Sequence, residues 1–288
     1  MKEEERQNLY KLFRDHEDVM GSSRTTLVAL ESLINAIKRL KCVDDAFEGL
    51  LMELGDVIKN TEPKIVPLIH LIEDFEVEMK SHFGKKFEKI RGLALKLLTE
   101  KMTRFQLNME KVSENGTKHV NDNDFIIVHS PSMVVKNALI VAHADLHKKF
   151  QVLILKQDFI KTKQLMSDFS KAGLDHIVIP EYNLSQYLER ANKLFIGAMS
   201  VTADKKVIAA VGTAGIVSLC HLNEIPVYLL INSLKFAHQI LLEQHIHKKE
   251  EIIQEDDFIY RLTTHSHDKI DLTLIDHLIT EVGEIPQM

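Results

Sequence analysis

Apolar residues in the first 115 positions recur at intervals of three and four, the spacing that places side chains on one face of a helix. The pattern returns in four stretches, and the polar positions between are rich in Lys and Glu, which favour helices. These stretches cover residues 27–40, 47–58, 68–75 and 83–109. Residues 1–115 are therefore predicted to form an all-helical domain.

The periodicity changes after the segment 113–124, whose Gly, Asn and Asp residues interrupt the helical pattern. Short β-branched runs then alternate with helical stretches, which is typical of a parallel sheet covered on both faces. Strands are predicted at 125–129, 151–155, 176–180, 193–198 and 226–231. Helices are predicted at 133–148, 161–172, 184–192, 213–222 and 271–283, the last together with a closing strand. The predicted fold class is α/β, with residues 116–288 forming a Rossmann-like domain after the helical one.

Polar side chains follow three of the predicted strands. In open parallel sheets, ligands bind beyond the carboxyl ends of the strands. Binding residues are therefore sought among the side chains that come directly after these strands: His129, Ser130, Ser132, Met199, Ser200, Asn232, Ser233 and Lys235.

Gly212 and Thr213 stand at the start of a predicted helix, where backbone N–H groups and the helix dipole attract anions. The hydroxyl of Thr213 either adds to such a site or simply caps the helix, and the capping role is favoured from local sequence. The chain contains neither a GxGxxG run after a strand nor a GxxxxGK[ST] motif. No nucleotide cofactor is therefore expected.

Composition excludes several classes of function. The 288 residues carry a net charge of −6 with both signs spread along the chain, which does not favour nucleic-acid binding. The charged N-terminus and the short apolar runs predict neither a signal peptide nor a membrane span, so a cytoplasmic protein is expected. Cys42 and Cys220, one in each half, do not form a disulfide framework or a CxxC metal pair.

The 15 histidines raise the question of a metal site. His143 and His147 share one face of a predicted helix, but the sequence between them lacks the Glu of an HExxH motif. The pairs His245/His247 and His265/His267 lie in charged, loop-like sequence without a third ligand nearby. No metal site is predicted.

Four segments resemble a family that unites the alpha, beta and delta regulatory subunits of translation initiation factor 2B with two sugar-phosphate isomerases. These isomerases act on methylthioribose 1-phosphate and ribose 1,5-bisphosphate. The segments cover residues 125–139, 195–221, 225–236 and 271–286. The second is the most specific, since it is similar to the family pattern GADxIxxNGxxxNKIGT without a gap from Gly197 to Thr213.

The resemblance also shows where this chain departs from the isomerases. Their acid–base pair is a Cys in the first loop and the Asp of the GAD motif, but here the loop has no thiol and Met199 replaces the Asp. Ala209 and Ala210 replace an Asn-Lys pair that contacts substrate in the enzymes. These losses predict a pseudoenzyme without catalytic residues. The positions that imply a retained ligand-binding pocket are His129, Ser130, Ser132, Gly212, Thr213 and Lys235.

The resemblance implies a non-catalytic regulatory protein that forms a homodimer through the α/β domain and binds a phosphorylated sugar or nucleotide. A translation-related protein partner is also implied. One alternative is an aldose–ketose sugar-phosphate isomerase whose acid and base have moved, with His129 or Asp204 in that role. Another is a scaffold that binds only protein.

Overall fold

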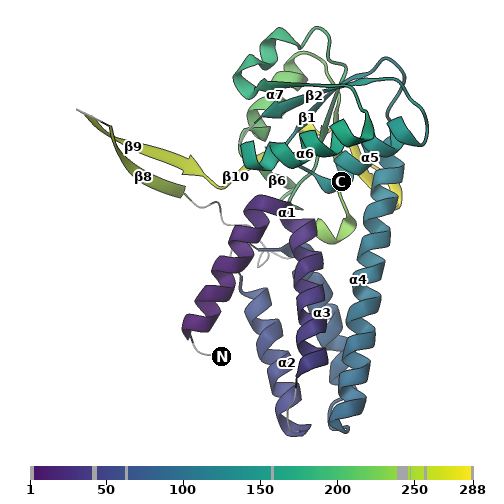
Figure 1. Ribbon diagram of the computed structural model, residues 1–288, viewed down its shortest axis with the longest axis vertical. Helices are drawn as coiled ribbons and strands as arrows, with labels where there is room; N and C mark the ends of the chain where they lie inside the picture. Colours follow the sequence, from purple (N-terminus) through teal and green to yellow (C-terminus); the bar gives the residue numbers. More distant parts are fainter. Residues whose placement is uncertain are drawn as a thin grey trace.

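The computed structural model describes residues 3–40, 44–61, 64–156, 159–238, 246, 248–255 and 258–286. Cys42, His245 and His247 lie outside these ranges. The N-terminal part consists of upright helices that stand beside one another beneath a sheet (Figure 1). They are α1 (Glu3–Arg39), α2 (Asp44–Lys59), α3 (Val66–Lys80) and α4 (Phe87–Thr117). The apolar stripes read from the sequence form the core among them.

Helix α1 is interrupted at Gly21, whose backbone angles of φ 76° and ψ 162° are not helical. Glycine adopts such a conformation without the steric cost that other residues meet. The helix therefore bends at this residue (Figure 1).

The main sheet has seven strands in the order β12-β11-β7-β4-β1-β2-β3. Their bounds are β1 (Phe125–His129), β2 (Gln151–Lys156), β3 (His176–Pro180), β4 (Lys193–Ile196), β7 (Val227–Leu230), β11 (His277–Thr280) and β12 (Gly283–Ile285). All neighbouring strands are parallel except β11 and β12. The chain adds β2 and β3 on one side of β1 and then β4, β7 and β11 on the other, so the strand order reverses between β1 and β4. This arrangement confirms the Rossmann-like α/β prediction.

The two faces of the sheet belong to different cores. Helices α5 (Met133–Ala144) and α6 (Phe159–Ala172) join α1 and α4 over one face, in a core that runs continuously from the helical part to the strands. Helix α7 (Thr213–Leu222) packs in the second core, on the other face. Side chains along β1 alternate between the two cores, as the two-residue period of a strand requires.

Helix α4 continues to Thr117, past the domain boundary predicted at residue 115. At its end, a Cβ on Gly116 would lie 2.4 Å from Leu230 Cδ2 of β7 and 3.1 Å from Ala138 Cβ of α5. Only a glycine allows the helix to approach the sheet this closely. Because the helices and one face of the sheet share a core, the division into two domains stays a prediction.

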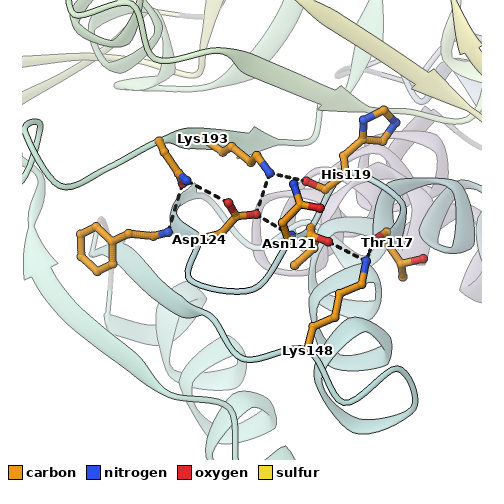
Figure 2. A network of polar contacts seen from close by, with 9 residues as sticks. Thr117, His119, Asn121, Asp124, Lys148 and Lys193 are labelled. Atoms are coloured by element: carbon orange, nitrogen blue, oxygen red, sulfur yellow. Dashed lines mark hydrogen bonds and ion pairs between the residues drawn. The ribbon is translucent and has the colours of Figure 1, made fainter.

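A buried ion pair lies where α4 leads into β1 (Figure 2). Lys193 Nζ lies 2.6 Å from Asp124 Oδ2 and donates a hydrogen bond to the backbone oxygen of His119. Asp124 also accepts from the Asn121 backbone N–H and the Asn192 side chain. The network fixes the chain as it passes from the last helix of the bundle into the central strand.

Two predicted helices are replaced by other structure. Residues 181–192 form only the short 3-10 turn η1 (Glu181–Gln186), from which Leu184 packs into the second core before the chain reaches β4. Residues 271–283 form the 3-10 turn η4 (Leu272–Leu274), the strand β11 and the start of β12. Here Leu278, Ile279 and Thr280 are all buried, and the segment pairs with β7 in parallel.

Further short elements have no counterpart in the sequence prediction. Strands β5 (Ser200–Val201), β6 (Lys206–Ala210) and β10 (His267–Asp271) form a small antiparallel sheet, and η2 (Ser233–Lys235) follows β7. Strands β8 (Lys248–Glu255) and β9 (Phe258–His265) form a hairpin that projects from the body of the molecule (Figure 1). Among the described residues, no helix combines the length and apolar character needed to cross a membrane.

Candidate functional site at the carboxyl ends of β1 and β4

The reversal of strand order brings the segment after β1 against the segment after β4. A Cβ on Gly197 would lie 2.3 Å from Ser132 Oγ, so glycine is needed for the two segments to approach. Ser132 is the N-cap residue of α5, and its hydroxyl accepts a long bond of 3.5 Å from the Val135 N–H. A reversal of this kind is where open α/β sheets bind their ligands, and the predicted binding residues lie around it.

Ser130 occupies the turn between β1 and α5 in a left-handed conformation, with φ of 64°. A residue with a side chain is strained there by about 1 kcal/mol or more. Its backbone oxygen accepts from the Ser132 N–H at 3.1 Å, which holds the turn closed. Such strain often occurs at binding and catalytic sites.

His129 closes β1 and is fully buried. Its Nδ1 lies 2.9 Å from Thr213 Oγ1, and its Nε2 lies 2.8 Å from Glu181 Oε1. The Thr213 hydroxyl donates its single hydrogen to the Ala210 oxygen at 2.5 Å, so it accepts from His129 Nδ1–H. The direction of the first contact is therefore fixed by the second.

Because His129 Nδ1 carries a hydrogen, only Nε2 of the ring faces Glu181. An ionised carboxylate only accepts hydrogen bonds, so a carboxylate form of Glu181 requires a second proton on the ring, at Nε2. If the ring lacks that proton, the carboxyl group must carry it instead. The contact between Nε2 and Oε1 is thus a hydrogen bond when one of the two atoms carries a proton.

Gly212 is the N-cap residue of α7, with φ of +91°, and a Cβ there would lie 2.7 Å from Glu181 Oε2. The favoured capping role for Thr213 is therefore wrong, because its hydroxyl bonds Ala210 and His129 instead. The Ala214 N–H donates to Asp268 Oδ2 at 2.9 Å. Two of the chain's own carboxylates thus lie at the helix N-terminus where an anion was expected.

Lys235 lies in η2 and is almost buried, with 8% of its surface exposed. Its Nζ donates to the Ala198 oxygen at 2.7 Å, in the loop that follows β4. The ammonium group therefore lies against the loop that contains Gly197.

The structure brings the six predicted residues into two adjoining groups. His129, Gly212 and Thr213 surround Glu181, whereas Ser132 and Lys235 contact the Gly197–Ala198 segment. Ser130 lies in the turn that connects these groups. The roles of these six residues in binding remain predictions.

The two acid–base candidates weighed from the sequence are not equivalent. His129 is in the site, whereas Asp204 is exposed in the turn between β5 and β6, where it accepts a bond from Thr202. Strand β6 separates that turn from Gly212. Met199, at the position of the family's Asp, is buried.

Sequence reasoning missed Glu181. The residue directly follows β3, so the rule that pointed to His129 applied to it as well. Its side chain retains 30% exposure, whereas the His129 side chain has none. Of the pair, Glu181 is the group that solvent or a ligand reaches.

The model of the initiation factor 2 subunit family matches residues 18–287 of this chain. The chain belongs to the initiation factor 2 subunit family. Similar family members include ribose 1,5-bisphosphate isomerase from Archaeoglobus fulgidus, with 22% identity over 93% of this chain and 86% of the relative. The eIF2B subunit delta of Dictyostelium discoideum is 23% identical over 93% of this chain, which spans 47% of that subunit.

Solved structures agree with the family's fold. The eIF-2B protein of Pyrococcus horikoshii superposes with a TM-score of 0.81 at 20% identity, covering 99% of this chain and 98% of the other. The 5-methylthioribose 1-phosphate isomerase of the same organism gives 0.76 at 13% identity, covering 96% and 85%.

These family members contradict the prediction that the chain is not an enzyme. Ribose 1,5-bisphosphate isomerases from Pyrococcus furiosus and Thermococcus kodakarensis are also among its relatives. The prediction rested on the missing Cys and Asp and on Ala209 and Ala210, which replace the Asn-Lys pair. It took no account of the carboxyl group that the fold places against His129.

Proposed function

We propose that this protein is an aldose–ketose isomerase acting on a phosphorylated sugar, with Glu181 as its acid–base group and His129 as the residue that positions it. The observation that carries the proposal is the contact of 2.8 Å between Glu181 Oε1 and His129 Nε2 at the carboxyl ends of the strands. General acid–base catalysis requires a titratable group within hydrogen-bond reach of the proton that moves. Glu181 supplies that group in a chain without the family's Cys and Asp.

In ribose 1,5-bisphosphate the C1 oxygen is esterified, so isomerisation begins when the C1–O4 ring bond breaks and O4 gains a proton. Loss of the C2 proton then gives an enol phosphate. Delivery of a proton to C1, with loss of the proton of the C2 hydroxyl, gives the ketose and balances the proton gained at O4. In the proposed reaction, Glu181 as a carboxylate takes the C2 proton and returns it to C1. Its partly exposed side chain suits direct contact with substrate. The buried His129 is a positioning residue that holds the carboxyl group in place.

The phosphate group is proposed to lie beside Lys235 and the hydroxyls of Ser130 and Ser132. A buried ammonium group and hydroxyls are suitable partners for phosphate oxygens. The N-terminus of α7 is a less suitable place, since Glu181 and Asp268 already lie there. A homodimer and a cytoplasmic location are also proposed, both on the family resemblance.

The experiment measures turnover of ribose 1,5-bisphosphate and of 5-methylthioribose 1-phosphate by the purified protein. We expect Glu181→Gln to lower kcat by about 10²- to 10⁴-fold with one of these substrates, the usual contribution of a general acid or base. Asp204→Asn is the matched control, because it removes an exposed carboxylate outside the site and is expected to leave the rate unchanged.

Circular dichroism of each variant separates a lost reaction from a lost fold. Full activity in a folded Glu181→Gln variant contradicts the assigned role. Loss of activity in Asp204→Asn transfers the role to Asp204. Absence of turnover of both substrates by the wild-type protein contradicts the proposed substrate class.

A further inference from the structure

A second cluster of polar side chains lies at the opposite edge of the sheet, near the amino ends of the strands. It combines His119 from the turn between α4 and β1, His277 at the start of β11, and Glu284 in β12. One potential ligand atom from each residue lies within 4.8 Å of the others. His277 and Glu284 lie in the neighbouring strands β11 and β12, whereas His119 is distant in sequence and joins them only through the fold.

The distances in the cluster are close to those around a metal ion. His277 Nδ1 lies 2.7 Å from Glu284 Oε1, and His119 Nε2 lies 3.8 Å from Glu284 Oε2. Two donor atoms on a tetrahedral zinc ion, with bonds of about 2.0–2.1 Å, are separated by about 3.3–3.4 Å. Rotation of the exposed Glu284 side chain changes both of these distances, so its carboxylate is able to adjust to an ion held by the two imidazoles.

Neighbouring rings hold the two imidazoles in place. The His277 ring stacks on Tyr228, with centroids 4.2 Å apart and planes 11° apart, and the two residues face each other in adjacent parallel strands. The His119 ring lies 5.4 Å from the same tyrosine. The His119 backbone is fixed by the bond from Lys193 (Figure 2). Contact with Tyr228 therefore restricts how both imidazole rings turn.

The charges around the cluster do not exclude a cation. Lys193 is paired with Asp124, and Lys118 donates to Asn115 Oδ1. Glu284 brings a negative charge to the cluster itself. An ordinary ion pair would explain why His277 lies next to Glu284. It would not explain why His119 lies close enough to both to serve as a third ligand.

We propose that His119, His277 and Glu284 bind a divalent transition-metal ion of the zinc class, with water in the remaining position. Two imidazoles and one carboxylate are a known ligand set for zinc with an open position. The site is separate from Glu181, because it lies at the other edge of the sheet and uses none of the same side chains. It replaces the sequence prediction of no metal, which examined only histidines that are close in sequence.

The experiment titrates the EDTA-treated protein with Zn²⁺ and, for spectroscopy, with Co²⁺. We expect one equivalent of tightly bound metal and visible d–d absorption from bound Co²⁺. Affinity should fall at least about tenfold in each of His119→Gln, His277→Gln and Glu284→Gln. The matched control is His221→Gln, which removes an exposed imidazole of α7 and is expected to bind metal as the wild type does.

A thermal-shift measurement gives an independent readout. Zn²⁺ is expected to raise the Tm of the wild type and of His221→Gln more than that of His277→Gln. Equal affinity in the wild type and all three ligand variants overturns the proposal, since the metal then binds elsewhere. Absence of tight Zn²⁺ binding by the wild type overturns it as well. Circular dichroism identifies any ligand variant that loses metal because it is misfolded. The two remaining ligand variants then test the proposal.

Discussion

At the scale of single residues, burial decides which polar groups are available for chemistry. Cys220 of α7 is fully buried, and burial raises the pKa of its thiol to about 12. The thiolate, which is the nucleophilic form, is therefore almost absent near neutral pH. This agrees with the inert role that the helical sequence around Cys220 indicates. Glu181, by contrast, keeps 30% of its side chain exposed.

A variant with Cys42→Ser tests this view, because Cys220 is then the single thiol. We expect the folded variant to react with a disulfide reagent at pH 8 on the order of 10³-fold more slowly than a free cysteine. Reaction should become fast in denaturant, which serves as the control. A fast reaction under native conditions contradicts a buried thiol.

The candidate site was only partly predictable for a related reason. His129 and Thr213 follow strand ends or begin a helix, and such positions are visible in a sequence. Their contact with each other and with Glu181 depends on how the strands are ordered in the sheet. No local sequence pattern determines the order of the strands. The sequence alone therefore predicted neither the contact with Glu181 nor the direction of the hydrogen bonds.

At the scale of elements, the junction between α4 and β1 depends on one buried ion pair. Lys193 and Asp124 retain 10% and 5% exposure of their side chains, and both also bond neighbouring residues of the junction. Removing one partner of such a pair leaves an uncompensated buried charge, which costs about 3–5 kcal/mol.

We therefore expect Lys193→Met to lower the free energy of unfolding by about 3–5 kcal/mol in denaturant titrations. The control is Lys96→Met, which removes a lysine from an exposed pair with Glu100 and should cost less than about 1 kcal/mol. Combining Lys193→Met with Asp124→Asn should cost less than the sum of the two single changes, because no charge is then left unpaired. Equal effects of Lys193→Met and Lys96→Met are incompatible with a buried pair.

Elements with one clear period were predictable, and those whose form depends on distant partners were not. The strands β1 and β3 and the helix α7 have the predicted bounds, since their apolar runs are continuous or helical without ambiguity. The segment 271–283 has apolar residues at both helical and strand spacings. Residues 277–280 of this segment form a strand because they pair with β7 and because consecutive side chains are buried there.

At the scale of the whole molecule, helix α4 belongs to both parts of the chain. It packs against α1 in the bundle and against α5 and β11 over the sheet, within one continuous core. Neither part keeps its apolar face covered when the other unfolds. The two parts are therefore expected to be stable together rather than separately.

Calorimetry measures this coupling directly. We expect a single unfolding transition whose calorimetric and van't Hoff enthalpies agree, because the shared core makes the chain one cooperative unit. Two resolved transitions would instead mean that the helical and α/β parts unfold independently.

The tight crossing of α4 over the sheet also limits how such chains can be recombined. A chimera that joins the helical part of one relative to the sheet of another has to match Gly116 to Leu230 and Ala138. A junction placed in the segment 113–124, where the sequence composition changes, would take α4 from one relative and its contact residues on the sheet from the other. Crossover points ahead of Phe87, where α4 begins, transfer the helix together with the sheet on which it rests.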